Sequence, residues 1–172
     1  EVVVIEDGSD FSAEKIVLSY QDQFPIRYVS QTNQGQGFAR NTGMNQAKGD
    51  FFIILDSDVI LPKGYLAIVA DAIESRNLDA FGGPDAASGD FSILQKAMDF
   101  AMTYFWTTGG IGGKLQYLEQ YQAVGFNTGV ITAFFDKTQW FIDPHRGAGI
   151  DWCSLFNQVE YQHKRVEGDF VY

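Results

Sequence analysis

The sequence FFIILDSD, at residues 51–58, is an apolar run that ends in two aspartates separated by one serine. An uninterrupted apolar run of this length is typical of a strand that is buried on both faces of a parallel sheet. Pro62 follows the run at a position where a helix can begin. We therefore expect a central strand over residues 51–55, which delivers Asp56 and Asp58 to the carboxyl edge of the sheet.

Strand and helix patterns alternate on either side of this run. We expect strands over residues 2–5 and 26–30, a short strand and turn over 80–84, and helices over 13–21, 38–47 and 62–75. Ser12 is the expected N-cap of the first helix. The predicted inward residues are Ile16, Val17 and Tyr20 in the first helix and Leu66, Val69, Ala70 and Ile73 in the third. This alternation predicts an α/β fold with a mainly parallel sheet.

The second half of the sequence is less regular. Its patterns predict a helix over residues 91–106, a glycine-rich loop over 107–114, a strand over 126–135 and a helix over 151–163. The 172 residues suit one domain with a substantial core.

Charge and cysteine content exclude some classes of protein. The formal net charge of −10 argues against a nucleic-acid partner, because such proteins carry a basic surface. The single cysteine, Cys153, cannot form an internal disulfide, which fits a reducing compartment. We expect neither a membrane-spanning segment nor a signal peptide.

Acidic side chains follow two of the predicted strands. Glu6 and Asp7 follow the first strand, and Asp56 and Asp58 follow the third. The carboxyl ends of parallel strands share one sheet edge, so the four carboxylates are expected in one crevice. Crowded carboxylates repel, and an oxygen-preferring cation such as magnesium or manganese relieves the repulsion and can bind a diphosphate. The alternative for an isolated pair is a turn aspartate that caps a helix.

Several motifs, in this order, resemble the family 2 glycosyltransferases. The first half carries DGS at 7–9, NQGQGFARNTG at 33–43, AKGD at 47–50 and LDSD at 55–58, and the second half carries FGGPD at 81–85, TTGGIGGK at 107–114 and FNTGV at 126–130. The resemblance implies the GT-A fold, two abutting Rossmann-like halves in a single domain that spans residues 1–172. Residues 1–80 would bind the nucleotide and 81–172 the acceptor, and the sequence lacks the family's first strand and helix.

The resemblance also implies roles for individual residues. Asp7 would contact the base, Arg40 the base or diphosphate, Asp56 the ribose or metal, Asp58 the metal, and Gly82 and Gly83 the donor sugar. A guanidinium suits phosphate or a planar base edge. The alternatives are an ion pair between Arg40 and Asp50, and ordinary turn chemistry for the two glycines.

The acceptor base is the point at which the sequence departs from the family. An inverting transfer needs a carboxylate to deprotonate the acceptor hydroxyl. The family supplies it from a Gly-Glu-Asp-Ile-Asp type segment, whereas RGAGIDW at 146–152 has Ala148 and Gly149 where the acidic pair should stand. Asp151 is the remaining candidate base, and its alternative is a helix-capping aspartate.

A basic segment near the end of the sequence resembles another family motif. His163 would be a metal ligand there, with Lys164 and Arg165 as phosphate partners. The alternative for His163 is a surface histidine between basic residues.

The resemblance implies a metal-dependent, inverting transfer from a nucleotide-diphosphate sugar, most simply a UDP-sugar, to a glycan or lipid-linked acceptor. It also implies manganese or magnesium, a cytoplasmic location with peripheral membrane association, and a part in cell-envelope polysaccharide synthesis. Two other readings stay open. A non-catalytic nucleotide-sugar-binding domain would explain Ala148 and Gly149. A receiver-type phosphoacceptor domain would share the acidic pair after the first strand and Asp56, but the sequence has no late Lys-Pro pair.

Overall fold

The computed structural model describes residues 1–82, 92–94, 96–97, 100, 128–138 and 163–165. The chain divides into two compact units. The first contains Glu1–Phe52 and Ile131–Asp151, and the second contains Ile53–Val130 and Trp152–Tyr172. The functional division at residue 80 stays a prediction.

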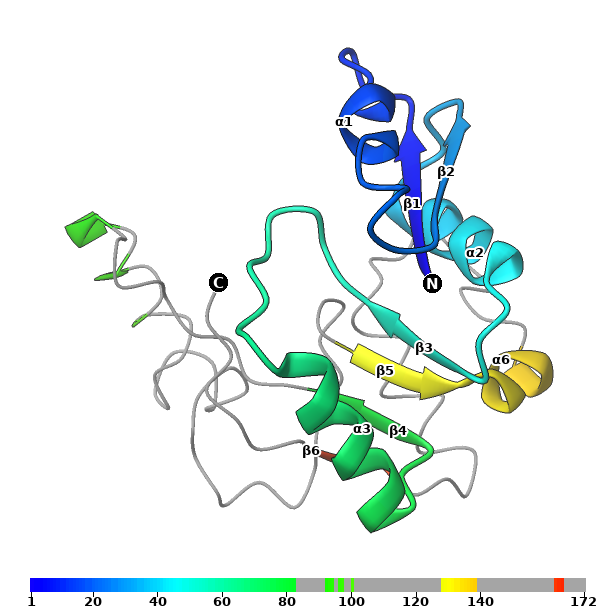
Figure 1. The fold of residues 1–172 in the computed structure, drawn as a ribbon, viewed down its shortest axis with the longest axis vertical. Helices are drawn as coiled ribbons and strands as arrows, with labels where there is room; N and C mark the ends of the chain where they lie inside the picture. Colours follow the sequence, from blue (N-terminus) through cyan, green and yellow to red (C-terminus); the bar gives the residue numbers. More distant parts are fainter. Residues whose placement is uncertain (83–91, 95, 98–99, 101–127, 139–162, 166–172) are drawn as a thin grey trace. The chain divides into compact units, whose positions relative to one another are not determined.

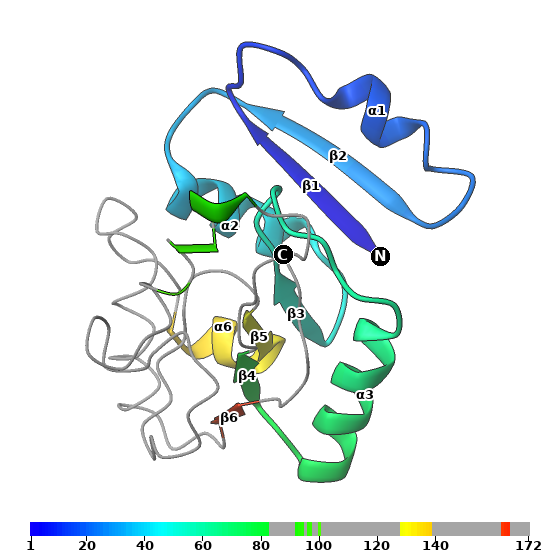
Figure 2. The ribbon, with the colours of Figure 1, turned by 90° about the vertical axis from the view of Figure 1, so that its left-hand side faces the viewer.

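The first unit is built on a pair of parallel strands. β1 (Val2–Asp7) and β2 (Ile26–Gln31) run in register from one end to the other, and their last residues, Asp7 and Gln31, are direct partners. α1 (Glu14–Leu18) contacts β2, and α2 (Gln36–Gln46) contacts β1. The two helices lie on opposite sides of this strand pair (Figures 1 and 2). The strand–helix–strand–helix order predicted from the sequence is confirmed here.

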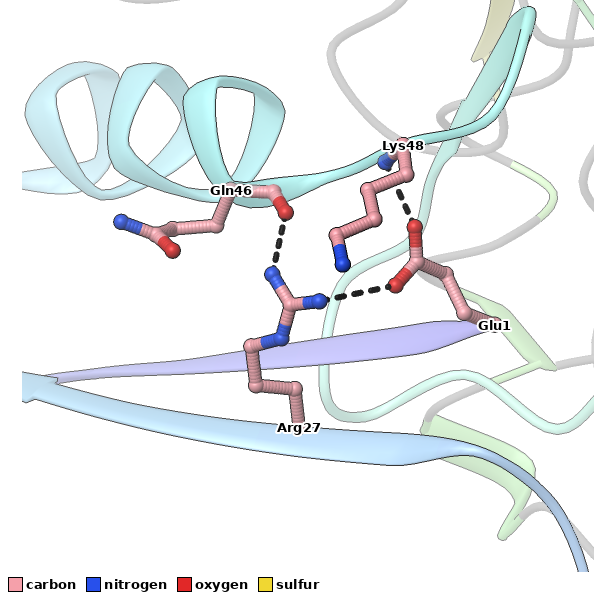
Figure 3. Close-up of polar contacts among 4 residues, drawn as sticks. All are labelled: Glu1, Arg27, Gln46 and Lys48. Atoms are coloured by element: carbon pink, nitrogen blue, oxygen red, sulfur yellow. Dashed lines mark hydrogen bonds and ion pairs between the residues drawn. The ribbon is translucent and has the colours of Figure 1, made fainter.

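Charged side chains at the amino end of the strand pair hold the carboxyl end of α2 (Figure 3). Arg27 donates a hydrogen bond to the carbonyl oxygen of Gln46, the last residue of α2, and forms an ion pair with Glu1 at 3.4 Å. Glu1 also accepts a hydrogen bond from the backbone N–H of Lys48 at 2.5 Å. A cation near the last carbonyl groups of a helix opposes the negative end of its dipole. Arg27 therefore fixes one end of the helix that carries Arg40.

The second sheet has four strands in the order β3-β5-β4-β6. These are β3 (Phe51–Ile54), β4 (Ala80–Gly82), β5 (Thr128–Ile131) and β6 (His163–Arg165). β4 is antiparallel to β5 and parallel to β6. Figure 1 shows β3 and β4 pointing the same way. This arrangement confirms the predicted type of sheet, which is mixed and mainly parallel.

Apolar side chains of α3 and the second sheet form a core. α3 (Tyr65–Arg76) buries Tyr65, Val69 and Ala72, which recur at helical spacing along one face. Phe81 and Val130 are fully buried in β4 and β5. A Cβ atom at Gly129 would lie 2.0 Å from a ring carbon of Phe81, so the β5 backbone passes directly against this ring.

The predicted inward faces of α1 and α3 are only partly correct. α1 is shorter than expected, and its Ile16 is 68% exposed, as is 44% of Tyr20 just beyond it. In α3 the predicted inward residue Leu66 is 63% exposed, because the buried face runs through Tyr65 instead. Ala70 is exposed as well. The other predicted inward residues fare better: Val69 is buried, and Val17 and Ile73 are half-buried.

Two strand predictions also need correction. β3 lies at the edge of the four-stranded sheet that the structure describes, and only Phe52 of this strand is buried. The strand predicted over 126–135 ends at Ile131, where α6 (Thr132–Thr138) begins. Thr132 donates hydrogen bonds to the carbonyl oxygens of Asp50 and Gly49, and Phe135 packs edge-on against Phe52. These contacts, distant in sequence, favour the helix over a continued strand.

His163 marks a third difference. It begins strand β6, whereas the sequence places it at the end of a helix over 151–163. Residues 151–162, together with the predicted helix over 91–106 for the most part and the loop over 107–114, lie outside the described residues. The helices that are described include none with the length and apolar character needed to cross a membrane.

Candidate functional site

The carboxylate of Asp7 lies at the carboxyl end of β1 and is bound by the segment that leads into α2. Its Oδ1 atom accepts hydrogen bonds from Gln31 Nε2 at 2.7 Å and from the backbone N–H of Gln34 at 3.0 Å. Its Oδ2 atom accepts one from the backbone N–H of Gly35 at 2.7 Å. Gly35 is the N-cap of α2, so a negative charge meets the positive end of the helix.

Gln31 connects the same carboxylate to α2. Its side-chain oxygen Oε1 accepts a hydrogen bond from the hydroxyl of Thr42 at 2.7 Å, while its Nε2 donates to Asp7. Thr42 lies within α2. A three-residue chain of hydrogen bonds therefore joins the end of β1, the end of β2 and the helix that carries Arg40.

These contacts decide the protonation of Asp7. Burial alone would raise the pKa of its carboxyl group, but the hydrogen bonds from Gln31, Gln34 and Gly35 together outweigh burial and hold the pKa below its ordinary value. The carboxylate is therefore ionised at neutral pH and can only accept hydrogen bonds.

Two glycines shape the turn around Asp7. Gly8 has φ of +71°, and a Cβ atom there would lie 2.6 Å from the backbone nitrogen of Asn33. Gly35 has φ of +98°, but a Cβ atom there would meet nothing within 4 Å. Gly8 is thus required for both conformation and space, and Gly35 for conformation alone. Gly37 lies buried inside α2.

Glu6 belongs to a different face of the strand from Asp7. Its Oε2 atom accepts a hydrogen bond from the backbone N–H of Ala13 at 2.7 Å, just before α1. That hydrogen bond, aided by Tyr28 and Ser12, lowers the pKa of Glu6 below its ordinary value. Successive residues of a strand point to opposite faces. The expected four-carboxylate cluster is therefore wrong in respect of Glu6, which anchors α1.

The second acidic turn follows β3. Asp56 is half-buried, and Ser57 and Asp58 are exposed. The donor chemistry suits magnesium or manganese, which commonly bind one or two carboxylates and take their other ligands from water and phosphate. Within the described part of the chain, no group of three or more His, Cys, Asp and Glu residues could hold a metal ion.

The second sheet brings some of the predicted residues to one edge. Because β3 and β4 point the same way (Figure 1), Asp56 follows the carboxyl end of one and Gly82 ends the other. Gly82 is buried in the strand and pairs with Thr128, so ordinary turn chemistry does not explain it. The register sets Arg165 beside Gly82, and His163 beside Ala80. Arg165 is thus the basic residue nearer to this edge along β6.

The remaining predicted residues divide into two groups. Arg40 lies within α2, half-buried, and its Nη1 atom is buried. Gly83 and Asp151 lie outside the described residues. Asp7 belongs to the first unit and Asp58 to the second, so their convergence at one crevice stays a prediction.

Gln31 and Thr42 are the site residues that the sequence reasoning missed. A signal was available, because Gln31 ends the strand next to the one that Asp7 ends. In a parallel pair of equal length, the two last residues are neighbours. Thr42 lies in the ARNTG segment already singled out, but no local pattern shows that its hydroxyl reaches β2.

Solved structures define the class of protein to which this fold belongs. The chain superimposes on S. aureus TarS 1-349 with a TM-score of 0.70 at 18% identity, covering 99% of this chain and 50% of that one. For the complex of the same TarS fragment with UDP the TM-score is 0.73 at 19% identity, with 100% and 50% covered. The fold is the GT-A fold.

The family follows from the sequence. The chain belongs to glycosyl transferase family 2, whose model matches residues 1–139. The hyaluronan synthase of Pasteurella multocida is 36% identical over 85 residues, which cover 48% of this chain and 9% of that protein. Glycosyltransferase GlyG of Streptococcus pneumoniae is 26% identical over 108 residues, which cover 59% of this chain and 36% of that protein. The chain thus matches only a minor part of these relatives and about half of the TarS fragment.

Proposed function

We propose that the chain transfers a sugar from a uridine-diphosphate sugar to a glycan or lipid-linked acceptor, with inversion at the anomeric carbon. The observation that carries this proposal is the Asp7 carboxylate, held ionised at the carboxyl end of β1 beside the start of α2. Each carboxylate oxygen offers about two acceptor directions. Among the described residues Oδ1 takes two donors and Oδ2 takes one, which leaves Oδ2 able to accept the imide N–H of uracil.

The other predicted residues take the roles that such a transfer requires. Arg40 would contact the base or the diphosphate, since a guanidinium suits both. Asp56 would bind the ribose or the metal, and Gly82 and Gly83 would lie against the donor sugar. A carboxylate must also accept the proton of the attacking hydroxyl, and Asp151 is the proposed acceptor.

A manganese or magnesium ion would be held by Asp58, with His163 as a further proposed ligand. Such an ion, when bound, stabilises the negative charge of the departing diphosphate. Asp58 would contribute a carboxylate that is close to Asp56 in sequence. Because this carboxylate is exposed to solvent, it can share the cation with a phosphate group. The contribution of Arg40 is a second positive charge on the helix that Asp7 and Arg27 fix at its two ends.

Asp58→Ala tests this proposal. We expect the manganese-dependent affinity for UDP, measured by titration calorimetry, to fall below detection in this variant. Asp71→Ala is a matched control, because Asp71 is an exposed aspartate on α3 outside both acidic turns. Unchanged affinity in Asp58→Ala, or an equal loss in Asp71→Ala, would contradict the assignment.

A nucleotide-sugar-binding domain without catalysis is the second candidate. The observation that favours it is the pair Ala148 and Gly149, where the family carries acidic residues. Both candidates bind UDP, so binding does not separate them. Release of UDP from a UDP-sugar in the presence of acceptor, lost in Asp151→Asn, would support transfer. Binding without any release would support the second candidate.

A further inference from the structure

We propose that Gln31 and Thr42 are positioning residues, which orient the Asp7 carboxylate so that it selects a base presenting an N–H donor. This inference rests on the proposed function, because the base belongs to the nucleotide donor. It adds to that function two residues that touch neither the nucleotide nor the metal in the roles given above. Their action is transmitted through Asp7 alone.

The chemistry of the contacts fixes the direction of the hydrogen bonds. An ionised carboxylate has no hydrogen to donate, so Gln31 must present its NH₂ group to Asp7. The amide oxygen of Gln31 then faces Thr42, and the threonine hydroxyl must be the donor. Both ends of the amide are therefore committed, and rotation of the amide by half a turn would break both hydrogen bonds.

Among the described residues, this orientation determines which oxygen of Asp7 keeps a free acceptor direction. Gln31 and the N–H of Gln34 together fill the two acceptor directions of Oδ1. The N–H of Gly35 takes one direction on Oδ2. A ligand therefore meets an acceptor on Oδ2 whose position depends on Gln31 from one side and on the start of α2 from the other.

The consequence is a preference between pyrimidines. The N3 position of uracil carries a hydrogen and can donate to Oδ2. The N3 position of cytosine is an acceptor, and it would place a lone pair against the carboxylate. The ratio of the affinities for UDP and CDP therefore reports on the position of Oδ2. A loss of global stability would weaken both ligands by the same factor and leave this ratio unchanged.

The experiment compares four variants of the full chain. Gln31→Met keeps the length of the side chain and removes the donor, and Thr42→Val keeps the shape and removes the hydroxyl. Thr42→Ser restores the hydroxyl, and Gln23→Met is the control, an exposed glutamine of the turn before β2. UDP and CDP are titrated with manganese, the melting temperature is recorded, and the pKa of Asp7 is followed by NMR of its carboxyl carbon.

We expect the UDP-to-CDP affinity ratio to fall about tenfold in Gln31→Met, the effect of one hydrogen bond to a charged group. A smaller fall, of about threefold, is expected in Thr42→Val, because Thr42 orients the amide of Gln31 and does not itself contact Asp7. The pKa of Asp7 should rise toward its ordinary value in both. Thr42→Ser and Gln23→Met should match the parent protein. An unchanged ratio in Gln31→Met and Thr42→Val, with folding retained, would overturn the inference.

Failure of the proposed function can be distinguished from failure of the positioning role. If the parent protein binds no UDP, the proposed function fails, and the pKa of Asp7 decides the positioning role by itself. A rise in that pKa in both variants, restored by Thr42→Ser, would then support the orientation of Asp7 by Gln31 and Thr42, whereas the selection of a base would fail together with the proposed function. A pKa that does not change would overturn this orientation.

Discussion

The two acidic turns of this chain differ in what surrounds their carboxylates. The turn after β1 is held by its own chain: among the described residues Asp7 receives three hydrogen bonds, and a Cβ atom at Gly8 would lie 2.6 Å from the backbone nitrogen of Asn33. The turn after β3 leaves Ser57 and Asp58 exposed. The first carboxylate is placed before any ligand arrives, whereas the second has solvent as its neighbour. We therefore expect the first turn to contribute more to stability than the second.

The sharpest way to break this comparison is a side chain at Gly8. Gly8→Ala should lower the free energy of unfolding by about 3 kcal/mol, from left-handed strain together with overpacking against the Asn33 backbone. Gly35→Ala carries strain without overpacking and should cost about 2 kcal/mol. Ser57→Ala, in the second turn, should change stability by less than about 0.5 kcal/mol. Urea unfolding measures all three. Equal losses at Gly8 and Gly35 would show that the Asn33 contact has no energetic weight.

Truncation of the carboxylates themselves gives the next largest contrast. Asp7→Ala should destabilise the protein by about 2 kcal/mol, because it leaves the N–H groups of Gln34 and Gly35 without their acceptor. Asp58→Ala should stay within about 0.5 kcal/mol of the parent protein, although the proposed function predicts that it loses manganese-dependent UDP binding. The measurement is the urea midpoint at unchanged slope. A destabilised Asp58→Ala would mean that the second turn is also structural.

The sequence predicts the order of the strands and helices well, but it predicts less well which face of each helix is buried. The order of β1, α1, β2, α2, β3, α3 and β4 follows from apolar periodicity, which depends on local residues alone. The exposure of Leu66 cannot be predicted from this periodicity, because a helix with apolar residues on several sides can pack any one of those sides against the sheet. The end of β5 depends on hydrogen bonds from Thr132 to Gly49 and Asp50, more than 80 residues away in sequence.

The candidate site divides in the same way. Asp7, Arg40 and Asp56 could be named from the sequence because they lie in motifs with fixed spacing. The separation of Glu6 from Asp7 could have been predicted from the alternation of strand side chains, and here the sequence was misread. Gln31 could have been placed beside Asp7 from the ends of the two strands, but the hydrogen bond from Thr42 to Gln31 could not, because only the fold determines how α2 lies against β2.

The smallest effect expected of the first turn is a dependence of stability on acidity. The folded-state pKa of Asp7 lies below the ordinary value of 3.8, and that of Glu6 below 4.5. Between each folded-state pKa and the ordinary value, the unfolded chain binds more protons, so stability rises with pH. The stabilisation is fully present above the ordinary values and is lost as pH falls through the folded-state values.

Urea unfolding between about pH 5 and pH 2, the range that contains the ordinary pKa values of carboxyl groups, measures this dependence. Asp7→Asn should flatten the part of the curve below 3.8, and Glu6→Gln the part below 4.5. Ser57→Ala should keep the acid slope of the parent protein, since it removes neither carboxylate of the first turn. An undiminished slope in Asp7→Asn would mean that the hydrogen bonds to Asp7 do not favour its charged form. The asymmetry between the two turns would then rest on the Gly8 packing alone.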